Sequence, residues 1–205
     1  MSEPSATRTR AVQLTLGATS FATVVGVVAA LGVPWAHRLI SGTGALAIAL
    51  LLTSLACAPT AALVPNGHAV LRVALKQARR WLGLSATLLA LVHAMLAMNG
   101  YLGGIVLRPI LEVPWLRDGG LALTILVALS LTSFPAITRA LRVRAWSALH
   151  RLVYLGAALA AIHALGAPFG AVSGGVLASL AVLVLLVARP IAWAIRSKRP
   201  APESD

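Results

Sequence analysis

The sequence predicts an all-α, polytopic membrane protein: a bundle of six transmembrane helices with both termini in the cytoplasm. Hydrophobic residues make up 59% of the 205 residues and charged residues only 11%. In soluble domains, apolar residues average roughly 45–50% and charged residues roughly 25%. The apolar residues fall into six runs, each close to the ~20 residues that a helix needs to cross ~30 Å of hydrocarbon. We therefore expect one six-helix domain at residues 11–195, between cytoplasmic tails at 1–10 and 196–205.

The first two predicted spans lie at residues 11–33 and 44–64. The first run is longer than the ~7–15-residue apolar core of a signal peptide, so we interpret it as a membrane span. Pro59 and Pro65 are expected to close the second span, because proline interrupts helical hydrogen bonding.

A basic segment at residues 66–80 separates the second span from the third, and we place it on the surface as a loop or short amphipathic helix. A polar loop follows the third span, and a basic turn follows the fourth. The remaining spans are predicted at 82–104, 119–137, 149–167 and 172–193.

Charge placement orients the bundle. Of the 17 lysines and arginines, all but Arg38, Arg108 and Arg117 fall on the side of the termini, which the positive-inside rule assigns to the cytoplasm. All five tryptophans fall at predicted span ends, as in an aromatic belt. The net charge of +12 therefore indicates topology and contact with anionic lipid, not nucleic acid binding. We expect a multi-pass membrane protein.

Few ionisable side chains are predicted inside the membrane. None of the five acidic residues falls within a span, which disfavours an ion-coupled transporter, since that function usually needs a carboxylate near the midplane. The single cysteine, Cys57, has no disulfide partner in the chain and is interpreted as a small buried hydrophobic residue. Only His93 and His163 remain deep in spans.

These two histidines are predicted to lie at the same depth. His93 follows Arg80 by thirteen residues and His163 follows His150 by thirteen, on helices that run in the same direction. At 1.5 Å per residue both lie roughly 20 Å from the cytoplasmic boundary. Two level imidazoles can ligate one haem iron from opposite faces, an arrangement suited to electron transfer. The alternative is a structural pair, hydrogen-bonded to backbone carbonyls or hydroxyls on nearby helices.

His150 is predicted at the level of Arg79 and Arg80. It can serve a second haem, with an arginine for the propionates, or it can be a solvated side chain at the interface. His37 and His68 fall in predicted loops and are treated as ordinary surface residues.

Several motifs resemble those of the ferric-reductase-like transmembrane domain, and most resemble its branch of haem-binding membrane subunits of periplasmic methionine sulfoxide reductase systems. The likeness runs from about residue 43 to 167. The motifs are Arg79-Arg80-Trp81-Leu82-Gly83-Leu84 before His93, Arg108-Pro109, Leu131-Thr132-Ser133, Trp146-Ser147-Ala148-Leu149-His150-Arg151-Leu152-Val153-Tyr154 and Ile162-His163.

The resemblance implies one or two b-type haems ligated by the residues matching His93, His150 and His163, and it brings FMN into consideration as a second cofactor. It also implies a cytoplasmic flavin reductase or quinol as electron donor and a periplasmic molybdenum-cofactor methionine sulfoxide reductase as acceptor. The location that it implies is the bacterial inner membrane. The chain would then be an electron-transfer subunit, not a stand-alone catalyst. Two alternatives are a ferric reductase or other transmembrane oxidoreductase of the same superfamily, and a cofactor-free membrane scaffold or transporter.

Overall fold

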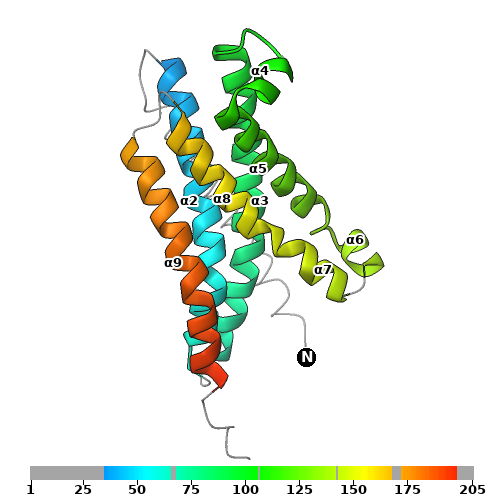
Figure 1. Ribbon diagram of the computed structural model, residues 1–205. Coiled ribbons are helices and arrows are strands. Elements are labelled where there is room, and N and C mark those ends of the chain that lie inside the picture. Colours follow the sequence, from blue (N-terminus) through cyan, green and yellow to red (C-terminus); the bar gives the residue numbers. More distant parts are fainter. Residues whose placement is uncertain (1–34, 66–67, 106, 142, 168–171, 198–205) are drawn as a thin grey trace, which may run out of the picture.

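The computed structural model describes residues 35–65, 68–105, 107–141, 143–167 and 172–197. Over these residues the protein is entirely helical and contains no strand (Figure 1). The predicted first span and N-terminal tail lie outside the described residues, as does most of the C-terminal tail. The helices are α2 (Trp35–Leu63), α3 (Ala69–Gly100), α4 (Leu107–Glu112), α5 (Pro114–Leu131), α6 (Pro135–Ala140), α7 (Val143–His150), α8 (Leu152–Gly166) and α9 (Val172–Ser197).

Among the described residues, 4 segments are long and apolar enough to cross a membrane: Leu39–Leu63, Ala69–Gly100, Pro114–Leu131 and Arg144–Gly166. They overlap the predicted second to fifth spans, and the last of them joins α7 to α8. The protein is thus a helical membrane protein. The predicted sixth span coincides with α9, which contains Pro190. Its role as a span, the first span and the side of the termini stay predictions.

Helix α2 differs from the predicted second span at its start and around its proline. It begins at Trp35 rather than residue 44, and Thr43 is accommodated because its Oγ1 donates to the carbonyl oxygen of Leu39 at 2.7 Å. Pro59 lies inside the helix, which continues to Leu63. The prediction that Pro59 closes the span was wrong, since a proline removes only one backbone donor and membrane helices tolerate this loss.

Helix α3 contains most of the basic segment predicted at residues 66–80 and most of the third span predicted at 82–104. The basic segment is not a separate surface element but the start of α3, and the helix ends at Gly100 rather than residue 104. Gly103 and Gly104, with φ of 67° and 141°, turn the chain after it. The 32 residues of α3 extend about 48 Å, against ~30 Å of hydrocarbon. Its basic first turns therefore reach beyond the apolar layer.

Helix α5 is displaced toward the N-terminus relative to the predicted fourth span. It begins at Pro114, so Arg117 and Asp118 belong to a helix and not to a loop. It ends at Leu131 because Phe134-Pro135 begins the separate helix α6, to which Ile137 belongs. The predicted end of the span, at about residue 137, therefore lies beyond the end of α5 at Leu131.

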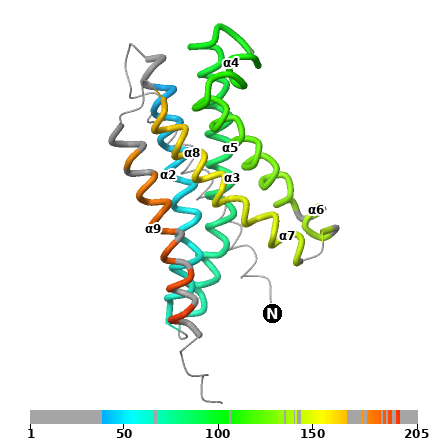
Figure 2. Tube along the Cα trace, in the orientation of Figure 1, coloured from blue at the N-terminus to red at the C-terminus, as the bar shows by residue number. Residues whose placement is uncertain are grey.

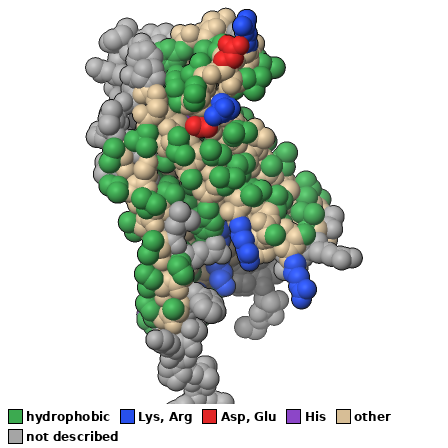
Figure 3. Space-filling view, in the orientation of Figure 1, with side chains coloured by type: hydrophobic (Ala, Val, Ile, Leu, Met, Phe, Trp, Pro, Cys, Tyr) green, Lys and Arg blue, Asp and Glu red, His purple; other side chains and the backbone are tan. Residues whose placement is uncertain are grey.

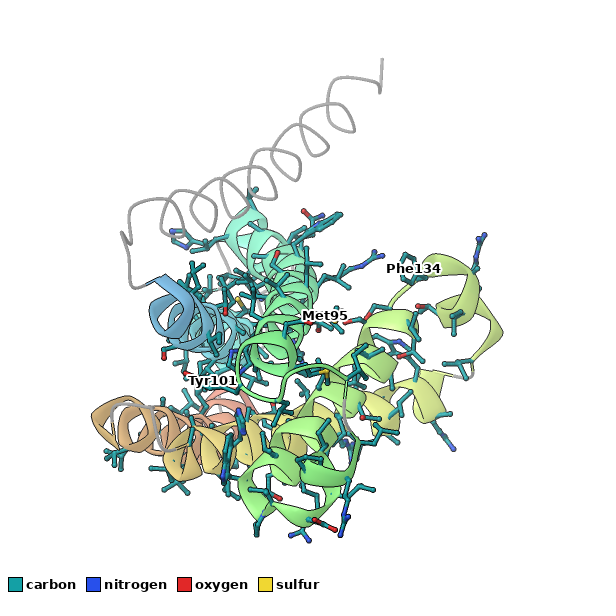
Figure 4. All side chains as sticks on the ribbon, turned by 90° about the horizontal axis from the view of Figure 1, so that it is seen from above. Met95, Tyr101 and Phe134 are labelled. Carbon is teal, nitrogen blue, oxygen red and sulfur yellow. The ribbon has the colours of Figure 1, made fainter. Side chains whose placement is uncertain are left out.

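The membrane helices pack as two pairs, α2 with α3 and α5 with α8, and α9 lies against α2 and α8 (Figure 2). The view from above shows side chains in the space between α2, α3, α5 and α8, with Met95 on α3 and Phe134 at the far edge beside α6 (Figure 4). Residues from five helices form the buried core: Leu51, Leu55, Ala86, Leu126, Ala157, Ala161 and Val182.

Charged side chains gather at the two ends of the molecule (Figure 3). Basic (blue) and acidic (red) side chains both occur near the end that carries α4. There Arg108 Nε donates a hydrogen bond to Glu112 Oε1 at 2.8 Å. Only blue side chains are visible near the opposite end. Between these ends the surface is mainly apolar, as expected for lipid contact.

Candidate functional site

The structure brings the two deep histidines together. The ring centroids of His93 on α3 and His163 on α8 lie 6.0 Å apart, with an interplanar angle of 76°. Both side chains are half-buried. They lie in the last third of their helices, closer to the end that carries α4 than to the basic end. The predicted common depth of the two rings is thus observed.

His93 rests against helix α2. Its Nδ1 lies 2.8 Å from the carbonyl oxygen of Ile40. The ring packs over Gly44, where a Cβ atom would stand only 2.9 Å from both Cε1 and Nδ1 of the imidazole. A carbonyl oxygen only accepts hydrogen bonds, so Nδ1 carries the proton.

His163 rests in the same way against helix α5. Its Nδ1 lies 2.7 Å from the carbonyl oxygen of Trp115, and a Cβ at Gly119 would stand 2.7 Å from Nδ1 and 2.9 Å from Cε1. The Trp115 ring covers the imidazole at a centroid distance of 5.5 Å. Gly166 allows α8 to approach this tryptophan, because a Cβ there would lie 2.7 Å from Trp115 Cβ.

The two histidines therefore use one local arrangement twice. In each case the acceptor carbonyl precedes the glycine by four residues, Ile40 before Gly44 and Trp115 before Gly119. Residues four apart lie one above the other on a helix face. The imidazole thus fits into a notch above a glycine and donates to the carbonyl at its edge. Helices α2 and α5 supply the notches.

The donor set fits a haem iron. With Nδ1 protonated, Nε2 is the free ligand atom, and among the described residues neither Nε2 makes a hydrogen bond. Metal–imidazole bonds of about 2.0 Å on both faces of one ion would set the ring centroids about 6.4 Å apart, close to the observed 6.0 Å. No group of three or more His, Cys, Asp or Glu is placed to hold a metal within the described part of the chain. Two histidines suffice for haem because the porphyrin supplies the other four nitrogens.

The alternative role of these histidines, hydrogen bonding to backbone carbonyls, is observed for one nitrogen of each ring. It is compatible with haem ligation through the other nitrogen. Each Nδ1 does bond a backbone carbonyl, which offsets the cost of burying one ring nitrogen. Such a second bond also fixes the tautomer and orientation of a metal-bound histidine.

His150, Arg79 and Arg80 meet at a separate cavity near the basic end. The cavity has a volume of about 780 Å³, and its wall also includes Ser54, Thr87 and Ser130. His150 Nε2 lies 3.3 Å from Ser133 Oγ, and the Trp146 ring packs on the imidazole at a centroid distance of 4.0 Å. His150 thus lines the same cavity as the two arginines that were predicted at its level. The cofactor that would bind in this cavity stays a prediction.

The remaining polar residues have structural surroundings. His68 is exposed before α3. His37 belongs to α2 and not to a loop. Cys57 is buried, as predicted, and its Sγ donates to the carbonyl oxygen of Thr53 at 3.3 Å. Ser54 donates from Oγ to the carbonyl oxygen of Arg79 on α3 at 2.8 Å.

Sequence reasoning did not identify the contacts that hold the histidines. Gly44 and Gly119 are separated from their imidazoles by tens of residues, and the acceptors at Ile40 and Trp115 are backbone atoms that any residue type supplies. The only signal in the sequence is a glycine in the first turns of each partner helix, which is too common to identify a contact.

Comparison with known proteins gives a consistent result. The family described as ferric reductase like transmembrane component matches residues 43–161. This segment includes His93, His150 and both notch glycines.

Two relatives illustrate the similarity. The protein-methionine-sulfoxide reductase heme-binding subunit MsrQ of Deinococcus radiodurans is 35% identical over 161 residues, which cover 78% of this chain and 76% of the relative. The protein of the same name from Brucella ovis is 33% identical over 132 residues, or 63% of this chain and 60% of the relative.

Proposed function

This chain belongs to the ferric reductase-like transmembrane family, and within it we propose that the chain is a b-type haem electron-transfer subunit. It would carry electrons from a cytoplasmic flavin-linked donor to a periplasmic methionine sulfoxide reductase. Its similarity to proteins named as the heme-binding subunit MsrQ supports this assignment. The similarity covers most of the chain.

The observation that carries the proposal is the His93–His163 pair. Two imidazoles with ring centroids 6.0 Å apart, each bonded through Nδ1 to a carbonyl, can present both Nε2 atoms to one iron. Haem held by these two histidines would supply one-electron chemistry suited to electron transfer rather than oxygen binding.

The chain's own residues would hold this cofactor rigidly. The carbonyl oxygens of Ile40 and Trp115 keep both imidazoles in the tautomer that ligates through Nε2. The Trp115 ring, at a centroid distance of 5.5 Å from His163, would shield that imidazole from water. Haem bound here would supply a one-electron couple, and the surrounding residues would keep its two ligands in place in both oxidation states.

The cavity around His150 is proposed as a second cofactor region. Arg79 and Arg80 line it beside His150, and guanidinium groups suit carboxylates and phosphates because they donate two parallel hydrogen bonds. The cavity would take a second haem or the propionates of one. FMN is the alternative occupant, since its phosphate offers the same acceptor chemistry.

The proposed direction of electron flow follows from the predicted topology. With the basic end in the cytoplasm, electrons enter near His150 from a flavin reductase or quinol and leave near His163. An inside-negative potential favours outward electron movement by about 2.3 kcal/mol per 100 mV for a full crossing. A periplasmic molybdenum-cofactor methionine sulfoxide reductase is the proposed acceptor, and the bacterial inner membrane the proposed location.

A reduced-minus-oxidised visible spectrum of the purified protein, with haem quantified per chain, tests the proposal. We expect sharp b-type bands. Reoxidation by a purified methionine sulfoxide reductase, compared with reoxidation by ferric citrate, then separates the proposed acceptor from direct ferric reduction. A colourless protein from haem-supplied cells would overturn the proposal and leave a cofactor-free scaffold.

A further inference from the structure

The two glycine notches set the position of the imidazoles. At Gly44 a Cβ atom would lie 2.9 Å from two ring atoms of His93, and at Gly119 it would lie 2.7–3.0 Å from three ring atoms of His163. Ordinary carbon contacts begin near 3.4 Å. Any side chain at either position must therefore push the ring outward by about half an ångström or more.

A hydrogen bond also restricts the movement of each imidazole ring. The bonds from Nδ1 to Ile40 and Trp115, at 2.8 and 2.7 Å, hold the imidazole at the edge of the notch that the glycine opens. A ring displaced from the notch must lengthen this bond or rotate away from it. Either movement changes where Nε2 lies.

We propose that Gly44 and Gly119 are positioning residues that fix the depth and ring orientation of the two haem ligands. This inference rests on the proposed function, since it assigns a role toward the iron that His93 and His163 would share. Functional groups generally need placement within about 0.5 Å of the productive geometry. A methyl group at either glycine displaces the ligand by a comparable amount.

The two positions are not equivalent. A Cβ atom at Gly119 would approach the ring to 2.7 Å, against 2.9 Å at Gly44, so a methyl group there displaces its imidazole further. A neighbouring glycine provides a matched control. Gly120 lies on the same helix, and its Cβ would meet Ile110 Cγ2 at 3.3 Å and no histidine.

The first experiment compares Gly44→Ala, Gly119→Ala and Gly120→Ala in the purified full-length protein. Haem per chain, spin state by electron paramagnetic resonance and midpoint potential are measured for each. We expect a loss in haem affinity of about 10- to 100-fold, as for other groups that orient metal ligands, with a new high-spin signal. The effect should be larger for Gly119→Ala than for Gly44→Ala. Gly120→Ala should match the unmodified protein.

Three outcomes are distinguishable. Unmodified protein without haem rejects the proposed function itself. Haem-replete Gly44→Ala and Gly119→Ala variants with unchanged spectra and potentials reject only the positioning role. Variants that lose haem in the expected order, with a shifted potential in the haem that remains, support both.

A double-mutant cycle covers the case in which an alanine variant fails to fold. Alanine is the better helix former, so any loss of stability must come from the contact with the ring. Thermal unfolding of haem-free protein should show that Gly44→Ala destabilises the chain containing His93 and not the His93→Ala chain. It should still destabilise the His163→Ala chain. Equal loss in all three backgrounds would make Gly44 a general packing residue and overturn the inference.

Discussion

Ser54 on α2 donates a hydrogen bond from Oγ to the backbone carbonyl oxygen of Arg79 on α3, over 2.8 Å. The serine is 5% exposed, so this bond lies between the helices and not at the surface. It joins α2 to α3 where the basic part of α3 ends and the cavity begins. The bond thus fixes the backbone of a residue that we place in the second cofactor region.

Ser54→Ala is expected to lower the free energy of unfolding by about 0.6 kcal/mol, and by no more than about 1.7 kcal/mol, the range of hydrogen bonds between membrane helices. Thermal unfolding in detergent measures the effect. Thr53→Ala is the control, since Thr53 Oγ1 is exposed and bonds Ala49 in its own helix. A larger loss for Thr53→Ala than for Ser54→Ala would contradict this reading.

His93→Ala and His163→Ala should each abolish or severely reduce haem content, because each would remove one of the two proposed haem ligands. Haem per chain, measured as the pyridine complex, provides the test. His68→Ala should retain full haem content, since His68 is exposed outside the spans. The same haem content in all three variants would eliminate the ligand assignment.

His150→Ala should leave the spectrum of the His93–His163 pair intact and affect only a second haem population. The physical reason is distance, because thirteen residues of helix separate His150 from His163 by about 20 Å. Redox titration with spectral separation of the components measures this. Complete loss of haem would mean that His150 is essential to the paired site.

Glu112→Gln should leave haem content unchanged. It should change the free energy of unfolding by no more than about 0.5 kcal/mol, since exposed i,i+4 ion pairs contribute little. The side chains of Arg108 and Glu112 are 83% and 61% exposed. Unfolding measured at low and high salt tests this. A marked loss of electron delivery with unchanged haem would instead point to a role for this pair in partner binding.

The predicted orientation can be tested with reporter fusions. Alkaline phosphatase inserted after Gly104 should be active, because the turn after α3 is expected in the periplasm. A fluorescent protein fused to the C-terminus should be fluorescent, because the C-terminus is expected in the cytoplasm. Inactive phosphatase at Gly104 would invert the topology and the proposed direction of electron flow.

The sequence was sufficient to predict the helical membrane class, the second to fifth spans and the common depth of His93 and His163. These predictions depend on composition and on the rise per residue, which act locally along the chain. Helix ends were less accurate. Pro59 lies within α2 and Pro135 separates α6 from α5, because the effect of a proline depends on which neighbouring groups replace its missing bond.

The surroundings of the histidines could not be predicted for a different reason. The bonds from His93 to Ile40 and from His163 to Trp115 span 53 and 48 residues. They depend on the register between packed helices, which residue spacing within one helix does not contain. Gly44 and Gly119 become informative only when that register is known.

Each histidine notch is also complete within one helix pair, α2 with α3 and α5 with α8. The two halves of the site can therefore form separately as each pair enters the membrane, because neither half needs contacts from the other. Cofactor insertion would then join two prebuilt halves rather than order a loose chain. On this view haem would add one more contact between two helix pairs that the shared buried core already joins, and the folded protein would gain stability when the cofactor binds.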